Sequence, residues 1–267
     1  MSVLDLTGRV ILVTGGSTGI GLAIADAVLQ AGGQVCVCAR GERRLAAVAE
    51  RRPDAADRIL AVPCDVTVEA AVASCVRQCI DRFGRLDGCV ANAGIDGVAP
   101  LHEMSLQEWR RVITGNLDSA FLVCREAIRV MLEHDIRGSL VTVGSVAALR
   151  GRPGRAHYVA AKAALVGLTR SIAVEYGARG IRANAVMPGP VDTEMSLQAP
   201  DHESLSRRAA QQVPVGRRGT PGEIAAVVIY LLSELSQYHT GDVICVDGGL
   251  SAVLADRLML LAGRCRR

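Results

Sequence analysis

The chain has 267 residues, half of them hydrophobic and only 3% aromatic, which suits one large α/β domain with an aliphatic core. Its formal net charge is +3, and no basic run is interleaved with aromatic residues, so nothing favours binding to nucleic acid. There is no signal segment and no apolar run of the roughly 18 residues that a membrane span needs. We therefore expect a cytoplasmic protein without membrane attachment.

The nine cysteines show no metal-binding spacing, and we expect no metal site. We expect Cys36 and Cys38 to point to opposite faces of a strand, and Cys75 and Cys79 to lie in one apolar helical stripe. Buried, reduced thiols are the simplest interpretation of this pattern. The basic residues at 264–267 are interpreted as a solvated tail.

Apolar strands and helices alternate along the chain. The run at 10–14 predicts a buried parallel strand, and further strands are expected at 35–38, 60–62, 86–92, 139–143, 181–187 and 243–246. Helices are expected at 19–31, 68–83, 111–133, 157–178 and 220–235, with capping signatures at Ser105 and Thr220. The alternation predicts an α/β fold with a single Rossmann-like, doubly wound domain over residues 1–249. It would have a seven-stranded parallel sheet with helices on both faces.

Two segments stand apart from this pattern. Residues 190–219 are the least regular and are a candidate lid. Residues 250–267 form a C-terminal extension, in which Leu254, Leu258 and Leu261 fall on one helical face. We expect that face to pack on a neighbouring subunit or to cover a pocket.

A glycine-rich turn follows the first strand and opens the first helix, which is the context of a dinucleotide-binding fingerprint. Its glycines allow a tight turn, and the helix N-terminus favours the charge of a pyrophosphate. The spacing is Gly-x3-Gly-x-Gly. The candidate cofactor-binding residues here are Gly15, Ser17, Thr18, Gly19, Ile20 and Gly21.

Tyr158 and Lys162 lie four residues apart on a predicted helix, so their side chains share a face. Of the 30 basic residues, Lys162 is the one lysine. A cation about 4 Å from a phenol lowers the phenol pKa by roughly three units at an effective dielectric of about 20. The pair therefore predicts an acid–base centre. Ser145 follows another strand, at the sheet edge where parallel sheets place their ligands.

These motifs, in this order, resemble the short-chain dehydrogenase/reductase family, and in particular its 3-oxoacyl-carrier-protein reductase-like members. The resemblance covers roughly Leu6 to Gly249. It identifies an adenine-binding pair, a motif after the fourth strand and a segment near the nicotinamide amide. The matching residues are Asp65 and Val66; Asn92, Ala93 and Gly94; and Pro188, Gly189, Val191 and Thr193.

The resemblance implies an NAD(P)-dependent oxidoreductase that interconverts a carbonyl and a secondary alcohol. Tyr158 would be the acid and base, and Ser145 would steady the substrate oxygen. Lys162 would bind the nicotinamide ribose and lower the pKa of Tyr158. Tyr158 would also contact the cofactor. Asn116 would hold a water molecule in a proton relay. The resemblance also implies a homodimer or homotetramer.

The end of the second strand bears on the choice of cofactor. NAD enzymes of this fold usually place a carboxylate there, but this chain has Ala39 followed by Arg40. An arginine can pair with a 2′-phosphate. Arg43 and Arg44 add positive charge, whereas Thr18 stands where many NADP-preferring members have a second basic residue. The sequence predicts NADP(H) as the preferred cofactor, with NAD(H) as the alternative.

The substrate is expected to be a small-molecule or carrier-linked carbonyl or alcohol, held by residues 95–102, 147–157 and 192–212. Arg150, Arg152 and Arg155 would suit an acidic or carrier-linked substrate such as a 3-oxoacyl thioester, although solvated surface arginines are the favoured interpretation. Two other classes compete with an active reductase. One is a catalytically inactive dinucleotide-binding sensor or scaffold, and the other a sugar epimerase or dehydratase. The complete candidate catalytic set argues against the first, and the lack of an added substrate domain after Gly249 argues against the second.

Overall fold

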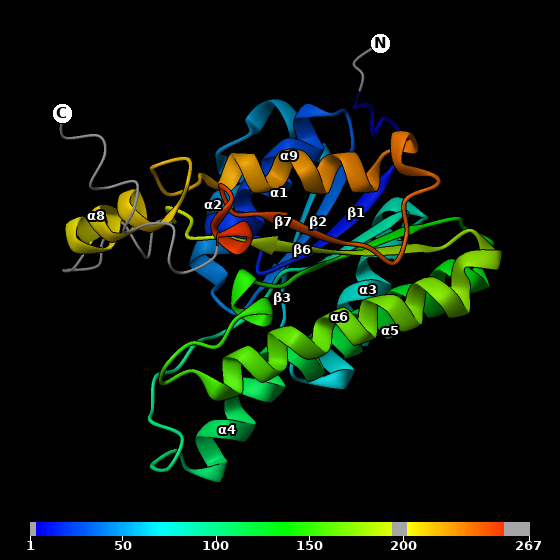
Figure 1. Cartoon of the computed structure of the whole chain (residues 1–267). Helices are drawn as coiled ribbons and strands as arrows, with labels where there is room; N and C mark the ends of the chain where they lie inside the picture. Colours follow the sequence, from blue (N-terminus) through cyan, green and yellow to red (C-terminus); the bar gives the residue numbers. More distant parts are fainter. Residues whose placement is uncertain (1–3, 194–201, 254–267) are drawn as a thin grey trace.

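The computed structural model describes residues 4–193 and 202–253. Seven parallel strands form one sheet in the order β3-β2-β1-β4-β5-β6-β7 (Figure 1). The chain moves outward from β1 in one direction and then starts again at β4 in the other, so the switch point lies between β1 and β4. The strands are β1 (Val10–Thr14), β2 (Gln34–Ala39), β3 (Ile59–Pro63), β4 (Gly88–Ala91), β5 (Ser139–Val143), β6 (Arg182–Pro188) and β7 (Val243–Val246).

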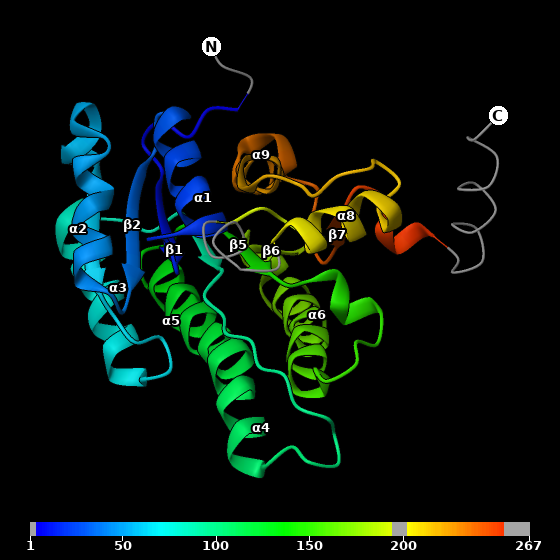
Figure 2. The ribbon, with the colours of Figure 1, turned by 90° about the vertical axis from the view of Figure 1, so that its left-hand side faces the viewer.

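Helices cover both faces of this sheet (Figure 2). On one face lie α1 (Gly19–Gln30), α2 (Glu42–Glu50) and α9 (Pro221–Leu232). On the other lie α3 (Glu69–Phe83), α5 (Ser119–Glu133) and α6 (Ala156–Tyr176). Two further helices, α4 (Leu106–Ile113) and α8 (His202–Gln212), stand beyond the sheet. The predicted fold class is thereby confirmed.

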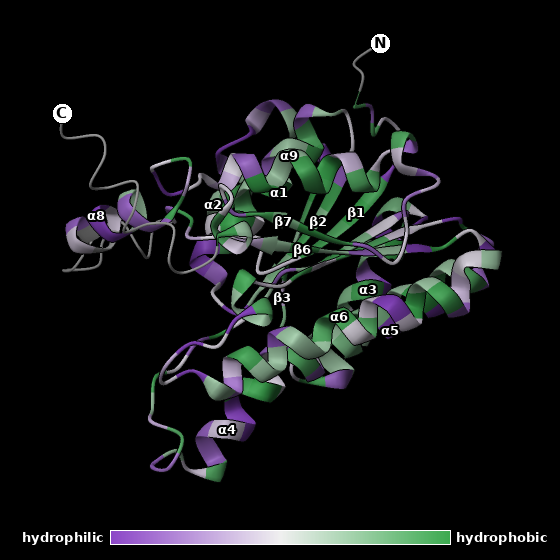
Figure 3. Ribbon diagram, viewed as in Figure 1, coloured by the Kyte–Doolittle hydropathy of each residue, from purple (hydrophilic) through white to green (hydrophobic). Residues whose placement is uncertain are grey.

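The side chains of a strand alternate between the two faces of the sheet and so contribute to two hydrophobic cores. In β1, Ile11 and Val13 join the core under α1 and α9, whereas Val10 and Leu12 join the core over α3 and α5. The central strands are therefore mostly apolar, as Figure 3 shows. Each such fully buried side chain contributes about 1.5–3 kcal/mol.

The expectation that Cys36 and Cys38 point to opposite faces is wrong. Both are buried in the same core, together with Cys75 and Cys79 of α3. Side chains two residues apart in a strand point the same way, and only neighbours alternate. β2 thus presents two thiols to α3, and the described cysteines are all free.

The predicted helices differ from the structure mainly where a helix is interrupted or short. The segment from Ser105 to Glu133 contains α4, a π-helical turn at Thr114–Asp118 and then α5. Ser105 caps α4 by accepting a 3.1 Å hydrogen bond from the Glu108 amide. At α9 the predicted capping box is complete between Thr220 and Glu223. The helix α2 has no counterpart in the sequence prediction, since only Leu45 and Val48 of it are buried.

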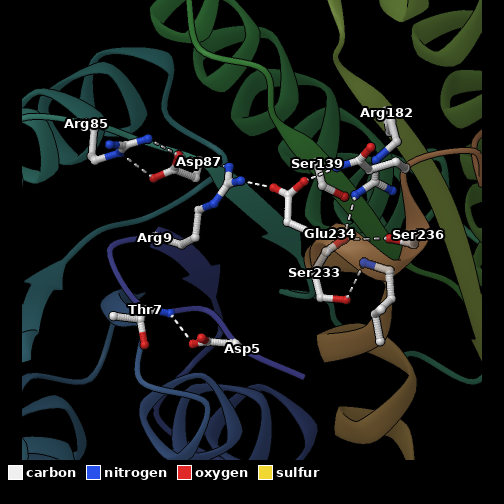
Figure 4. Close-up of polar contacts among 12 residues, drawn as sticks. Asp5, Thr7, Arg9, Arg85, Asp87, Ser139, Arg182, Ser233, Glu234 and Ser236 are labelled. Carbon is white, nitrogen blue, oxygen red and sulfur yellow. Dashed lines mark hydrogen bonds and ion pairs between the residues drawn. The ribbon is translucent and has the colours of Figure 1, made fainter. Parts of the chain in front are cut away.

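A polar network joins the strands at the edge opposite their carboxyl ends (Figure 4). At its centre, Asp87 accepts a 2.9 Å hydrogen bond from the Val10 amide and forms ion pairs with Arg9 and Arg85. Arg9 also pairs with Glu234, which follows α9. These contacts tie β1 and β4 to the end of α9 and so hold the switch point in place.

Among the described residues, no helix is both long and apolar enough to cross a membrane. The leucine face expected at 254, 258 and 261 lies outside the described residues, as do 194–201 of the candidate lid. What the structure describes of that lid includes α8.

Candidate active site

The glycine-rich turn between β1 and α1 depends on glycine for two physical reasons. Gly15 and Gly19 have φ angles of +63° and +55°, which other residues rarely adopt. A Cβ on Gly21 would overlap the carbonyl oxygen of Gly15. Thr18 is the N-cap residue of α1, and the first turn of that helix carries no acidic side chain. The turn therefore offers backbone amides and a helix N-terminus to an anion.

Asn92, Ala93 and Gly94 are held against this turn across the switch point. The Thr14 hydroxyl accepts hydrogen bonds of 3.0 Å from the amides of both Asn92 and Ala93. The Asn92 side chain in turn donates to the Thr14 carbonyl at 2.9 Å. The carboxyl ends of β1 and β4 thereby form one rigid rim.

A pocket of about 650 Å³ opens along this rim, a volume within the range of ligand sites. It runs from the glycine-rich turn past the ends of β2 and β3 to the end of α4 and the π-helical turn that follows it. Of the predicted cofactor-binding residues it is lined by Gly15, Ser17, Thr18, Arg40, Asp65, Val66, Ala93 and Gly94. Arg44 also lines it, and Arg43 does not. This elongated shape and its glycine cradle fit a dinucleotide.

The part of the pocket near β2 has charges of both signs. Arg40, directly after Ala39, is exposed beside the opening. Asp65 accepts hydrogen bonds from the amide of Thr67 at 3.0 Å and from its hydroxyl at 2.7 Å, which lower the Asp65 pKa. The end of β2 itself carries no carboxylate that would repel a phosphate.

Ser145 and Tyr158 meet beyond β5. Ser145 is the N-cap of a short 3-10 turn (Val146–Leu149), and its hydroxyl accepts from the Ala147 amide at 3.2 Å. Tyr158 lies in the first turn of α6, close enough to the Ser145 hydroxyl for that group to act on its pKa. Burial raises the pKa of Tyr158, and the neighbouring Ser145 hydroxyl opposes that shift in part.

Lys162 lies one helical turn further along α6 and is buried. Its Nζ donates a 2.9 Å hydrogen bond to the Val143 carbonyl and lies 5.8 Å from the centre of the Tyr158 ring. Burial lowers the pKa of Lys162 to about 8. The expected lowering of the Tyr158 pKa by a cation about 4 Å away is therefore wrong for this structure, in which burial of the phenol dominates.

Asn116 lies in the π-helical turn between α4 and α5. Its Nδ2 donates to the carbonyls of Ile95 at 2.7 Å and Val112 at 2.8 Å. Its Oδ1 is buried and has no hydrogen-bond partner within the described part of the chain. A Cβ on Gly94 would lie 2.6 Å from this Oδ1 and 3.3 Å from Lys162 Nζ, so both polar atoms face the same glycine.

The segment from Pro188 to Thr193 crosses back toward the glycine-rich turn. The Gly189 amide donates to the Val246 carbonyl at 3.0 Å, and Val191 forms a bridge with Gly219. Thr193 Cγ2 would lie 3.3 Å from a Cβ on Gly19. This contact brings the end of the segment to the start of α1, on the same rim as Gly15.

His157 lies at the end of the predicted substrate segment 147–157, but no individual role was predicted for it. It is fully buried, its Nδ1 accepts a 2.8 Å hydrogen bond from the Tyr158 amide, and its Nε2 lies 3.6 Å from Glu108 Oε1. The ring thus links the start of α6 to α4. The only signal in the sequence is its place directly before Tyr158.

Two of the three arginines in the 147–157 segment have partners within the protein. Arg150 donates to the carbonyls of Ser251 at 2.8 Å and Val253 at 2.6 Å, and Arg155 pairs with Asp96. Arg152 is exposed, and its charge lowers the Tyr158 pKa slightly. The first residues of the C-terminal extension therefore lie beside this segment.

Comparison with known proteins agrees with this geometry. The family model described as enoyl-(acyl carrier protein) reductase matches residues 15–251. The chain is 37% identical to the 3-oxoacyl-[acyl-carrier-protein] reductase FabG of Chlamydia pneumoniae, covering 93% of this chain and 99% of that protein. It is 38% identical to 2-(S)-hydroxypropyl-CoM dehydrogenase 3 of Xanthobacter autotrophicus, covering 93% and 98%.

A solved structure extends the agreement to three dimensions. The short-chain type dehydrogenase/reductase from Mycobacterium marinum superposes with a TM-score of 0.88 at 35% identity, covering 94% of this chain and 98% of that one. The similarity spans the glycine-rich turn, the strands and the helix with Tyr158 and Lys162. The chain therefore belongs to the short-chain dehydrogenase/reductase family and is an NAD(P)-dependent oxidoreductase.

Proposed function

We propose that this protein is an NADPH-dependent ketoreductase that reduces a carbonyl to a secondary alcohol. The observation that supports this most is that Lys162 Nζ and Asn116 Oδ1 both face Gly94, which lines the dinucleotide-sized pocket, while Lys162 also lies 5.8 Å from the ring of Tyr158. A nicotinamide cofactor supplies the hydride when bound. The residues of this chain would bind and orient it, hold the carbonyl oxygen and deliver a proton.

Tyr158 is the proposed proton donor. Because burial raises its pKa, the phenol holds its proton at neutral pH, which suits protonation of a carbonyl oxygen more than deprotonation of an alcohol. Ser145, whose hydroxyl acts on the pKa of Tyr158, would bond the same oxygen. The pair thus favours reduction as the working direction at neutral pH.

Lys162 and Asn116 are proposed to complete a proton path. One of the three N–H groups of Lys162 Nζ donates to the Val143 carbonyl, so two remain for the ribose hydroxyls and for water. The unpartnered Oδ1 of Asn116 faces the same glycine as Lys162 Nζ, and a water molecule between them would satisfy both. Protons would then reach Tyr158 from that water.

The cofactor would lie along the rim that the pocket follows. We propose that its pyrophosphate contacts Gly15, Ser17, Thr18, Gly19, Ile20 and Gly21, and that its adenine contacts Asp65 and Val66. The nicotinamide end would contact Asn92, Ala93 and Gly94, and then Pro188, Gly189, Val191 and Thr193. Arg40 would bond the 2′-phosphate of NADPH, supported by its exposure beside the pocket and by the neutral Ala39.

A carrier-linked 3-oxoacyl thioester is the proposed substrate class. The similarity to the Chlamydia 3-oxoacyl-[acyl-carrier-protein] reductase supports it, as does the exposed Arg152 near Tyr158. The competing possibility is an inactive dinucleotide-binding sensor or scaffold of the same fold. A turnover assay with NADPH and a panel of ketones, including a 3-oxoacyl thioester, separates the two. Tight NADPH binding without turnover of any ketone would favour the sensor.

We also propose a homodimer or homotetramer in a reducing, cytoplasmic setting. Phe121 of α5 and Val174 of α6 are apolar side chains, 44% and 86% exposed, that contact with a second copy would remove from water. The eight described cysteines are free, as is usual where thiols stay reduced. Light scattering of the purified protein tests the oligomeric state, and a monomeric mass would contradict it.

A further inference from the structure

Three thiols from separate elements meet behind the nucleotide pocket. The sulfur atoms of Cys38 in β2, Cys64 just after β3 and Cys75 in α3 all lie within 4.8 Å of one another. All three residues are buried. Among the residues that the structure describes, no other set of three or more histidine, cysteine or acidic side chains comes this close together.

The surroundings of the three thiols leave a small space between them. Cys38, Cys64 and Cys75 line a void that has no room for a water molecule, with apolar neighbours Leu12, Val66, Val72 and Val76. Two of the three, Cys38 and Cys64, also line the large pocket at its β2 end. The group is therefore buried on one side and reachable through the pocket on the other.

We propose that Cys38, Cys64 and Cys75 form a site for a thiophilic divalent d10 cation, of which Zn²⁺ is the physiological member. Three cysteines are a sulfur-rich ligand set of the kind such ions prefer. With zinc–sulfur distances of about 2.3 Å, tetrahedral geometry sets the sulfur atoms about 3.8 Å apart. The thiols must move together by at most about 1 Å to reach it.

The fourth ligand comes from the pocket side. Cys64 lines that pocket and keeps 5% of its surface exposed, so we place a water ligand on this side of the ion. Binding converts three thiols to thiolates and releases three protons, which leaves the site with a net charge of −1. That charge lies beside Asp65 and weakens the attraction that Arg40 and Arg44 exert on a phosphate.

The ion and the dinucleotide therefore oppose one another. By linkage, each lowers the affinity of the other by the same factor. This coupling rests on the proposed function, whereas binding of the ion does not. The ion site and the proposed function can therefore be disproved independently. A protein that binds Cd²⁺ at these thiols but does not bind NADPH would overturn only the proposed function.

The test uses the full chain with Cys245→Ser and Cys265→Ser, which remove the exposed thiol and the one outside the described residues. Anaerobic titration with Cd²⁺ is followed by the ultraviolet sulfur-to-metal charge-transfer absorbance, and Zn²⁺ is then added in competition. We expect one Cd²⁺ per chain, displaced by Zn²⁺, and a tenfold or greater loss of affinity in Cys75→Ala. Cys124→Ala, which removes a buried thiol outside the group, should bind as the parent does.

NADPH is the second arm of the experiment. Saturating NADPH should weaken Cd²⁺ binding in the parent, and Cd²⁺ should weaken NADPH binding in the parent but not in Cys75→Ala. Circular dichroism and NADPH binding are the checks that Cys75→Ala is folded. The proposal is overturned if the parent shows no stoichiometric band, if Cys75→Ala retains it, or if mass spectrometry finds a disulfide among these thiols in place of a bound ion.

Discussion

Lys162 donates a hydrogen bond of 2.9 Å from Nζ to the carbonyl oxygen of Val143, the last residue of β5. This bond holds the end of the ammonium group below the rim of the sheet, where burial lowers the Lys162 pKa to about 8 from 10.5. In the unfolded chain Lys162 keeps its proton up to a pH of about 10.5. Between pH 8 and 10.5 the unfolded state therefore binds more protons than the folded state, and stability rises with pH.

The first prediction follows from that sign. In the wild type, burying the Lys162 charge costs about 3 kcal/mol of folding free energy below pH 8, for a pKa difference of this size. Lys162→Met removes that charge and therefore that cost. The unpaired Val143 carbonyl offsets about 1–3 kcal/mol of the gain. The free energy of unfolding of the variant relative to wild type should fall by about 3 kcal/mol from pH 7.5 to pH 10.5. Urea denaturation at several pH values measures it, and a constant difference would contradict the buried charge.

The second prediction concerns Tyr158. Tyr158→Phe keeps the ring and removes the proton donor, so turnover should fall by at least about 10² while NADPH binding survives. Lys162→Arg should also fail, because a forked guanidinium does not replace a compact ammonium. Tyr230→Phe, whose hydroxyl bonds His239 away from the pocket, is the matched control and should remain active. Near-wild-type turnover by Tyr158→Phe would remove it from the proposed role.

The third prediction is a pH profile. Tyr158 keeps its proton through neutral pH, and Lys162 loses its charge as the pH rises through about 8. The kcat/KM for ketone reduction should therefore be flat near neutral pH and fall above about 8. Alcohol oxidation, which needs the phenolate, should rise over the same range. Parallel profiles in the two directions would show that these groups do not set the rate.

The fourth prediction tests the choice of cofactor. Wild type should have a higher kcat/KM with NADPH than with NADH. Ala39→Asp combined with Arg40→Ala adds a carboxylate at the end of β2 and removes the phosphate partner, so the ratio should reverse. Arg43→Ala serves as control, because Arg43 does not line the pocket. A wild type that favours NADH would contradict the assignment.

The fifth prediction concerns the network around Asp87. Asp87→Ala leaves the buried Val10 amide without its acceptor and should destabilise the fold by about 1–3 kcal/mol. Asp87→Asn retains an acceptor oxygen and should cost less. Denaturant midpoints measure both. Equal losses in the two variants would assign the effect to the ion pairs with Arg9 and Arg85 rather than to the amide.

The sequence was sufficient for the parts of this protein that depend on local pattern. The strands consist mainly of apolar residues, since both faces of a parallel sheet are buried, and such runs are recognisable without a structure. The glycine-rich turn and the Tyr158–Lys162 spacing are likewise local, because φ preference and helical periodicity act over a few residues. The short helix α2 was missed because only two of its residues are buried.

Tertiary structure decided the features that depend on which distant residues meet. Asn116 lies in a π-helical turn whose side-chain amide bonds Ile95, and His157 reaches Glu108 on another helix. The burial that raises the pKa of Tyr158 and lowers that of Lys162 comes from the whole fold, and a spacing of four residues cannot reveal it. The cysteines are a further example. Strand geometry alone places Cys36 and Cys38 on one face of β2. The packing of α3 against β2 and β3 is needed to bring Cys75 to Cys38 and Cys64. Residue spacing determines which face of an element a side chain occupies, and packing between elements determines what it meets there.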